Sequence, residues 1–508
     1  MLQSFGPADN RLRWHGVLFV FLLLGYAMLL CHNISTAMMW NDEGLSYYVA
    51  KDGFHQTIDR IGRDIHAPLY YILLSFVLQI YHGEFGLRII SVVSAIIALV
   101  FVYLSARILL GRNVALLAAL LFAASPDNLN WSQHARPYSF QTMLAAISFW
   151  GFVHILLADR DDDRLLGSGT ASISRPRAAS VPQTVVWWLA YAIGGGLAML
   201  AQHQAGFYVL ACSIVMAVAM LWDRAKARTL LVKWILANMV LVAIWLTWLP
   251  HFVVQFSHHL SGNNIAERHA NYLLDNHWEP LVDSLGVAYL WRLQPFPLFV
   301  YLPIVAVGLW RAIRCRSNLL WILLLWSAPL VICLVGYGLV HPIFGFVLST
   351  LHWMAVPYAI IVAFGITAIR IRVVQAAVLL VLLVLNARGI SNYYQWLPMS
   401  RPDVIAGFLV ERADRSDGII FAPSGSYRFS VSYYMGADWS SMAGMDPAID
   451  GDRLITTVAE AAHNPRNWVL IPEDGAPAVS FDAMNSYGVL AFEQRFSKVI
   501  LRLFDRRD

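Results

Sequence analysis

The sequence predicts an all-α polytopic membrane protein that ends in a small soluble α/β domain. Hydrophobic residues make up 58% of the 508 residues and charged residues only 13%, whereas soluble globular proteins have about 25% charged residues. Apolar runs of about 15 to 25 residues, the length of membrane-spanning helices, recur along the first 390 positions. After residue 398 they give way to short apolar segments between polar ones, which is typical of a soluble fold.

Eleven apolar segments are predicted to cross the membrane. They lie at about residues 16–32, 86–108, 113–128, 140–157, 184–201, 205–221, 234–250, 296–312, 319–340, 353–369 and 373–388. Arg11 and Arg13 precede the first segment and no small-residue cleavage site follows it, so we predict a retained first helix and not a removed signal. The apolar residues 67–81 are only 15 long, which favours an interfacial or re-entrant helix, with a short span as the alternative.

The distribution of basic residues predicts the orientation, because cytoplasmic loops are enriched in Lys and Arg. One alternating set of loops contains 17 of these residues, at 11–13, 107–112, 160–177, 224–233, 311–316 and 370–372. We therefore expect this set and the N-terminus on the cytoplasmic side of a bacterial inner membrane. An odd number of spans places the two ends of the chain on opposite sides of the membrane. The C-terminal 120 residues are therefore expected in the periplasm.

Residues 398–508 are predicted as a separate periplasmic α/β domain, which follows a transmembrane module at 1–397 whose first outer loop is 33–85. Strands are expected at 417–423, 467–473, 487–493 and 498–504, and helices at 403–414 and 452–463.

Composition also argues against several functions and sites. The net charge of +4 is spread over short loops, and no concentrated basic patch for nucleic acid is present. The four cysteines, Cys31, Cys212, Cys315 and Cys333, lack the spacing of a metal site or a disulfide framework. The polar loop at 158–183 is too short for a nucleotide-binding domain, and no Gly-rich phosphate loop occurs. The glycines at 194–196 lie in an apolar segment and predict close helix packing.

Asp42 and Glu43 begin the first outer loop, in the run WNDEGLSYYVA. A carboxylate at the membrane boundary can take a proton from an acceptor hydroxyl while its neighbours exclude bulk water. The alternative interpretation is a solvated acidic pair that caps the next helix.

Three more polar clusters occur in the outer loops: DIHAPLYY from Asp64, QHARPY from Gln133 and QHQ around His203. An arginine at the membrane is costly unless it is paired, and phosphate is its natural partner. Arg136 is therefore a candidate for binding a lipid phosphate, with snorkelling or an ion pair to the acidic residues as the alternative. His66 and His203 are candidates for orienting phosphate or sugar hydroxyls, with a satisfied interfacial histidine as the alternative.

These motifs resemble those of the GT-C superfamily of polyprenyl-phosphate-sugar glycosyltransferases, which includes protein O-mannosyltransferases, lipid A aminoarabinose transferases and bacterial lipopolysaccharide-core transferases. Asp42-Glu43 is similar to the acidic pair after the first span, and Asp64 to Leu69 resembles a D-x-H-P-P-L run, with Ala67 replacing the first proline. Gln133 to Tyr138 resembles an arginine-proline-tyrosine signature of bacterial members. The resemblance covers the first 220 residues best. It fails at His352, where many members have an arginine-tyrosine pair that contacts the donor phosphate.

The resemblance implies inverting transfer of a sugar from a polyprenyl-phosphate donor to a hydroxyl of a lipid, glycan or protein acceptor. Asp42 corresponds to the base, and Glu43 would orient the acceptor or share that role. Arg136 would offset charge on the leaving phosphate. The other expected donor contacts are His66, Tyr138, Gln133, His203 and Asp64. No obligatory metal is expected, because two carboxylates alone do not make a metal site; a divalent metal is the alternative.

Two other functions remain open at this point. A polysaccharide polymerase or ligase would use arginines and histidines in a large outer loop, and the loop at 251–293 contains His258, His259, Arg268, His269 and His277. A lipid-sugar transporter would need internal repeats or broken helices at mid-membrane, and the sequence has no recognisable repeat. Substitution of Asp42 discriminates these classes, because only the transferase requires that carboxylate.

Overall fold

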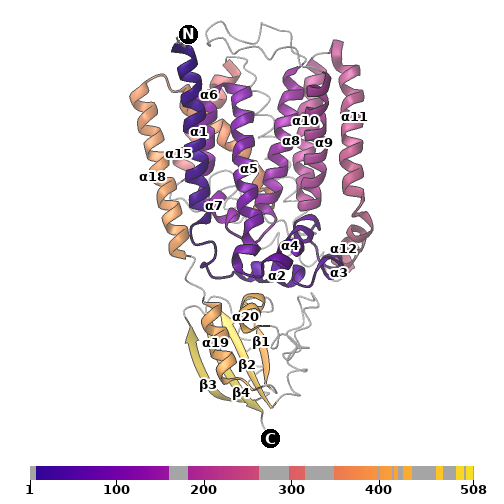
Figure 1. Cartoon of the computed structure of the whole chain (residues 1–508), viewed down its shortest axis with the longest axis vertical. Helices are drawn as coiled ribbons and strands as arrows, with labels where there is room; N and C mark the ends of the chain where they lie inside the picture. The colour runs from indigo at the N-terminus through magenta and orange to yellow at the C-terminus, as the bar shows by residue number, and fades with distance from the viewer. Residues whose placement is uncertain are drawn as a thin grey trace, which may run out of the picture. The chain divides into compact units, whose positions relative to one another are not determined.

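The computed structural model describes residues 7–158, 181–222, 224–261, 297–314, 348–396, 401–414, 417–421, 427–436, 465–472, 488–496 and 499–506. The chain forms two compact units (Figure 1). The first contains Met1–His32, Ile65–Leu73 and Arg88–Tyr393, and the second contains Asn33–Asp64, Leu74–Leu87 and Tyr394–Asp508. The predicted class, a helical membrane protein with a small C-terminal α/β domain, is confirmed.

The first unit is helical throughout its described residues. Its elements are α1 (Pro7–Cys31), α5 (Glu84–Leu110), α6 (Arg112–Ala123), α7 (Pro126–Ser132), α8 (Tyr138–Ala158), α9 (Val181–Ala201), η1 (His203–Ala205), α10 (Gly206–Trp222), α11 (Arg224–Leu246), α12 (Leu249–Ser261), α15 (Pro297–Arg314), η2 (Leu348–Met354), α17 (Ala355–Ala368) and α18 (Arg372–Trp396). The first turn of α5 and the end of α18 belong to the second unit, and α4 (Leu69–Ile80) is divided between the two.

Eight helices among the described residues are long and apolar enough to span a membrane, and each coincides with a predicted span. The predicted spans at 113–128 and 296–312 correspond to shorter apolar helices, and 319–340 lies outside the described residues. The run at 113–128 is interrupted because Ser125 caps a new helix, its hydroxyl accepting the Asn128 N–H, and Pro126 follows in the first turn. Residues 67–81 form α4, a helix of 12 residues.

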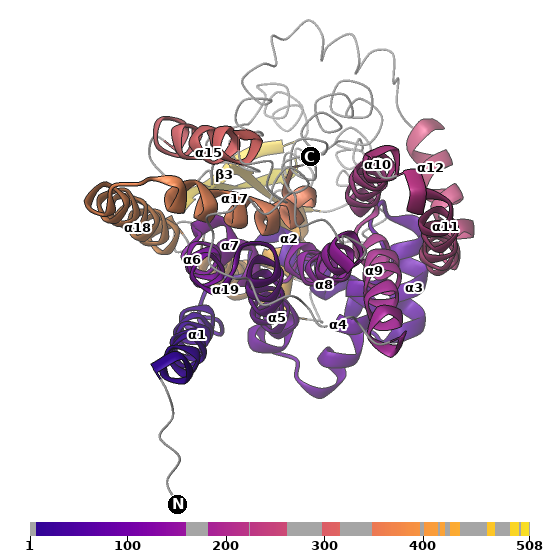
Figure 2. The ribbon, with the colours of Figure 1, turned by 90° about the horizontal axis from the view of Figure 1, so that it is seen from above.

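Burial separates central helices of this unit from peripheral ones. In α17, 83% of the most apolar segment is buried inside the protein. The buried share of the corresponding segment is 11% in α1 and 17% in both α11 and α18. Peripheral helices with exposed apolar side chains are what a lipid environment allows. Seen along the helices, α17 lies beside α6 and α15, and α9 lies between α8 and α11 (Figure 2).

The glycines of α9 explain how closely these helices approach, as the sequence predicted. A Cβ atom on Gly194 would lie 2.9 Å from the Leu144 carbonyl oxygen of α8. One on Gly196 would lie 2.9 Å from the Leu241 carbonyl oxygen of α11. Small residues therefore bring the backbones of three helices together.

The second unit contains the first outer loop and the C-terminal α/β elements. Its helices and strands are α2 (Asn41–Ala50), α3 (Phe54–Arg63), α19 (Pro402–Arg412), β1 (Gly418–Phe421), α20 (Arg428–Met435), β2 (Arg466–Pro472), β3 (Gly488–Phe496) and β4 (Val499–Arg506). All four predicted strands and the helix at 403–414 are confirmed. The predicted helix at 452–463 lies outside the described residues, and α20 is an element that the sequence analysis did not anticipate.

The strands form one sheet in the order β1-β2-β4-β3, in which β1 and β2 are parallel and the other neighbours antiparallel. Leu409 of α19 and Val431 of α20 share one core with Trp468 of β2 and Leu501 of β4. Both helices therefore cover the same face of the sheet (Figure 1).

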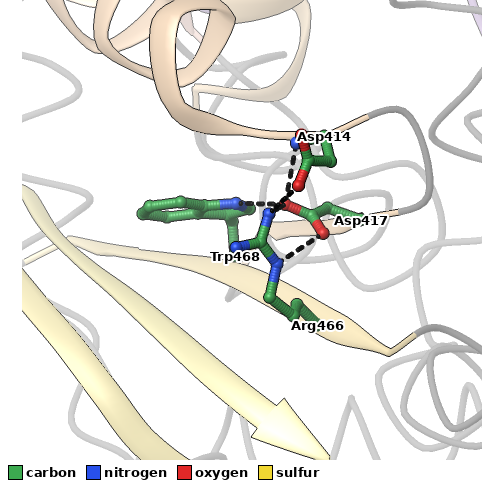
Figure 3. Close-up of polar contacts among 4 residues, drawn as sticks. All are labelled: Asp414, Asp417, Arg466 and Trp468. Atoms are coloured by element: carbon green, nitrogen blue, oxygen red, sulfur yellow. Dashed lines mark hydrogen bonds and ion pairs between the residues drawn. The ribbon is translucent and has the colours of Figure 1, made fainter.

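A group of charged side chains joins the start of β1 to the start of β2 (Figure 3). Arg466 donates to both carboxylate oxygens of Asp417, at 2.9 and 2.8 Å, and to Asp414 at 2.6 Å. The Trp468 indole N–H also donates to Asp417, whose side chain is only 1% exposed. The hydrogen bond with Asp417 is the largest of the interactions that raise the pKa of Arg466 above its ordinary value. This bidentate pair fixes the parallel strands at their first residues.

Candidate functional site

Arg136 is the centre of a polar cluster in the first unit. One terminal nitrogen of its guanidinium lies 3.1 Å from His66 Nε2, and further contacts of 3.4 Å reach the Tyr71 and Tyr138 hydroxyls. Because a guanidinium has only donors, His66 Nε2 is the acceptor in this contact. Arg136 and Tyr138 are each only 5% exposed, and Tyr71 is fully buried. We call these four residues the arginine cluster.

Local structure explains how Arg136 reaches this position. It lies in the turn between α7 and α8, directly before Pro137, which disfavours a helical conformation at Arg136. Its carbonyl oxygen accepts a 3.3 Å hydrogen bond from Ser91 of α5. The backbone is thus attached to a neighbouring helix while the side chain points to the residues around α4.

His203 is surrounded by aromatic side chains of α11 and α12. The Trp245 indole N–H donates to His203 Nδ1 at 3.4 Å, and the Phe252 ring packs edge-on at 5.0 Å. Gln255, one turn after Phe252 on α12, donates to the His66 carbonyl oxygen at 3.2 Å. Helix α12 therefore links the surroundings of His203 to the histidine of the arginine cluster.

Two other polar residues of this unit, Gln133 and His352, form hydrogen bonds that join separate helices. The Gln133 side-chain amide donates to the carbonyl oxygens of Leu29, Leu30 and His32, at 3.2, 2.9 and 2.8 Å. These carbonyl groups lie in the last turn of α1 and directly after it, where the carbonyls of a helix commonly need partners from outside. His352 Nε2 lies 2.7 Å from the Asn128 side-chain oxygen and so joins η2 to α7.

The acidic pair belongs to the second unit, where it forms the first turn of α2. Glu43 is fully buried, and its carboxylate accepts the Trp40 N–H at 3.1 Å, which is half of a capping box. Asp42 is half-buried. Negative charge is favoured at this end of a helix by the macrodipole. The two neighbouring carboxylates thus differ: one caps the helix and the other retains a solvent-accessible surface.

The surroundings of α2 are defined by contacts within the same unit. Arg60 of α3 forms an ion pair with Asp52 at 2.5 Å and lies 4.4 Å from the centre of the Tyr48 ring, which holds α3 against α2. Burial, and secondarily the Asp52 carboxylate, raises the pKa of Tyr47 above its ordinary value, so this phenol is protonated at neutral pH. Asp64 is 6% exposed and follows the last turn of α3.

Among the described residues, no group of three or more His, Cys, Asp or Glu side chains has the arrangement of a metal site. The absence of an obligatory metal stays a prediction. The histidines and arginine at 268–277 that favour a polymerase or ligase lie outside the described residues.

Of the residues that the sequence suggested, His66, Arg136 and Tyr138 are brought into direct contact. Sequence analysis missed two of their neighbours, Tyr71 and Gln255. Tyr71 lies in the same outer-loop motif as His66, and the paired tyrosines at the start of an apolar segment were a usable signal. No comparable signal pointed to Gln255, whose role depends on how α12 packs.

Comparison with known proteins agrees with these observations. The family model of dolichyl-phosphate-mannose-protein mannosyltransferases matches residues 65–172, a segment that contains the whole arginine cluster but not the acidic pair. No curated protein has a significant sequence match.

Three solved structures are similar over nearly the whole chain. ArnT from Cupriavidus metallidurans in the apo state superposes with a TM-score of 0.59 and 13% identity, over 97% of this chain and 98% of that one. The same protein bound to undecaprenyl phosphate gives 0.55 and 12%, over 96% and 97%. The archaeal oligosaccharyltransferase AglB from Archaeoglobus fulgidus, in complex with an inhibitory peptide and a dolichol-phosphate, gives 0.54 and 12%, over 96% and 74%.

At such low sequence identity the structural similarity shows the fold alone. The family model, which is a comparison of sequences, matches the segment around Arg136 independently of the structures. The chain is therefore a multi-pass membrane protein with the GT-C glycosyltransferase fold, and the resemblance seen in its motifs is confirmed at the level of that superfamily.

Proposed function

We propose that the protein is an inverting glycosyltransferase that moves a sugar from a polyprenyl-phosphate donor to an acceptor hydroxyl at the periplasmic face of a bacterial inner membrane. The main support is the buried arginine cluster, in which Arg136 is positioned by His66, Tyr71 and Tyr138 within the segment that matches the mannosyltransferase family. The similar structures contain undecaprenyl phosphate in one case and dolichol-phosphate in another, which favours a lipid-linked donor.

In the proposed reaction the acceptor oxygen attacks the anomeric carbon as the bond from that carbon to the phosphate oxygen breaks. Asp42 receives the acceptor proton, and Glu43 orients the acceptor or shares this role. The departing polyprenyl phosphate gains negative charge, which the Arg136 guanidinium offsets. His66, Tyr138, Gln133, His203 and Asp64 are proposed donor contacts. Because Arg136 provides the positive charge, no step is assigned to a metal.

The decisive experiment replaces Asp42 by Asn, which retains the shape of the side chain and removes its basicity. The full-length protein in nanodiscs is offered mannose, glucose, galactose and aminoarabinose on undecaprenyl phosphate, one at a time, with an extract of cell-envelope acceptors. The wild type should release undecaprenyl phosphate from one donor, and Asp42→Asn should do so about 10²–10⁴-fold more slowly while binding that donor normally.

Transfer at the wild-type rate by Asp42→Asn would show that the base is another group. It would also restore the polymerase, ligase and transporter alternatives, none of which requires this carboxylate.

A further inference from the structure

The helix that begins with the acidic pair rests on α20 of the C-terminal domain. The Met39 N–H, directly before α2, donates to the Tyr434 hydroxyl oxygen at 3.0 Å. The Phe429 N–H donates to the Asn41 side-chain oxygen at 2.9 Å. These two hydrogen bonds lie on either side of Trp40 and immediately before Asp42, so they fix the turn from which both carboxylates project.

The contact is mutual, because α20 depends on α2 for its own cap. The first N–H groups of a helix have no partner inside it. The residue before α20, Tyr427, has a left-handed backbone (φ 63°), and its side chain makes no capping hydrogen bond. The Asn41 side-chain oxygen accepts the hydrogen bond from the Phe429 N–H and so takes the place of a local capping side chain. Displacement of one helix from the other therefore breaks the hydrogen bonds that the Met39 and Phe429 N–H groups donate.

Gly44 determines how closely the two helices approach. A Cβ atom there would lie 2.5 Å from the Phe429 carbonyl carbon and 2.7 Å from its oxygen, which is nearer than nonbonded atoms can approach. The neighbouring atoms belong to the backbone of α20 and cannot rotate away. On the next turn, the Tyr47 and Tyr433 rings pack edge to face at 4.9 Å. The fit of α2 on α20 is thus fixed by a backbone-to-backbone contact two residues after the proposed base.

We infer that α20, through Tyr434 and the backbone of Phe429, positions Asp42 for proton transfer. This inference rests on the proposed function. Asn41, Gly44, Phe429 and Tyr434 are positioning residues, because they act on the acceptor step through α2. A small displacement of a catalytic group can lower the rate about 10²-fold. The C-terminal domain should therefore influence turnover and leave the affinity for the lipid phosphate unchanged.

The test compares three variants of the full-length protein in nanodiscs. Gly44→Ala pushes α2 away from α20, and Tyr434→Phe removes only the oxygen that accepts the Met39 N–H. Gly407→Ala is the matched control, because Gly407 lies in α19 of the same domain with no neighbouring heavy atom within 4 Å of an added Cβ. The measurements are kcat and KM with the donor that the wild type uses, and the affinity for undecaprenyl phosphate alone.

We expect Gly44→Ala to lower kcat by about 10–100-fold and Tyr434→Phe by a smaller factor. Both should bind undecaprenyl phosphate like the wild type, and Gly407→Ala should have the wild-type kcat. A double variant with Asp42→Asn and Gly44→Ala should be no slower than Asp42→Asn alone, because a displaced base and an absent base impair the same step.

Wild-type kcat in both Gly44→Ala and Tyr434→Phe would overturn the inference on α20. The proposed function would still stand in that case, provided that Asp42→Asn is inactive. Parallel losses of kcat and lipid-phosphate affinity would also overturn it, because they indicate general damage to the fold. If Gly44→Ala fails to fold, Tyr434→Phe decides the question. Wild-type turnover by Asp42→Asn would instead refute the proposed function.

Discussion

Arg136 is buried at a cost that its surroundings must offset. Removal of a charge from water is unfavourable unless other groups compensate, and its described contacts include two phenol oxygens and an imidazole nitrogen. The guanidinium itself has only donors and a positive charge, so it suits an anion such as phosphate. The planar fork of arginine matches phosphate oxygens in pairs, which an ammonium group cannot do.

The prediction at this scale is a graded loss of phosphate affinity. Arg136→Lys keeps the charge but loses the fork, so it should bind undecaprenyl phosphate more weakly than the wild type, and Arg136→Ala should be weaker still. Titration of the purified variants with undecaprenyl phosphate measures this order. Arg311→Ala is a matched control, because Arg311 lies in the same unit and donates to the Thr367 carbonyl oxygen. Unchanged affinity in Arg136→Ala would place the phosphate elsewhere.

Motif spacing predicted part of this site and could not predict the rest. His66, Arg136 and Tyr138 were chosen because each lies in an outer-loop motif, and loops on one face can meet. Gln133 was chosen from the same motif as Arg136, yet its side-chain amide caps α1, a helix about 100 residues earlier in the chain. Which side chain of a motif turns toward a ligand and which toward a helix end is set by tertiary packing, which the sequence does not display.

Among the elements, the strands were predictable and α20 was not. The four strands have alternating or continuous apolar runs bounded by polar residues, and the described structure reproduces each of them. Residues 428–435 are rich in tyrosine, phenylalanine and valine, which favour strands. They form a helix because Val431 and Met435, one turn apart, enter the core beside α19. Tertiary burial therefore overrides local propensity in this segment.

The pairing of β1 with β2 leads to a prediction on stability. Arg466→Ala removes the cation beside Asp417, whose side chain is 1% exposed. Loss of one partner of a buried ion pair costs about 3–5 kcal/mol, and the lower end is expected because Trp468 still donates to the carboxylate. Hydrogen exchange of the β1 and β2 amides in the full-length protein measures the change.

The control is Arg502→Ala in β4, which removes the cross-strand partner of Glu493 in β3. That pair lies near the surface, where ion pairs contribute about 0–1 kcal/mol. The hydrogen bond from Arg502 lowers the pKa of Glu493, so its stabilisation is present above the unfolded pKa and is lost as the pH falls through the folded one. Equal exchange rates in the two variants at neutral pH would show that Asp417 tolerates the loss of its cation.

On the scale of the whole molecule, the contact between α2 and α20 restricts the topology. Two helices in contact lie on the same side of a membrane, so the chain between them must cross an even number of times. If α1 is a further span, the total is odd and the termini are predicted to lie on opposite sides, as in the arrangement of eleven spans that the sequence predicts. We therefore predict that alkaline phosphatase, which is active only in the periplasm, is active when fused after Asp508. Fluorescence of a cytoplasm-only reporter at that position would contradict the predicted orientation.

The same contact has a consequence for how the protein is made. The hydrogen bonds between α2 and α20 join residues 388 and 395 positions apart. Translation at about 5–20 residues per second leaves roughly 20–80 s between emergence of the acidic pair and emergence of the helix that seats it. During that interval α2 lacks its contact with α20, which has not yet been translated. A chain that lacks its last 80 residues is expected to insert its helices normally but to be inactive in sugar transfer, because it lacks α20. Unfinished chains are therefore expected not to transfer sugar.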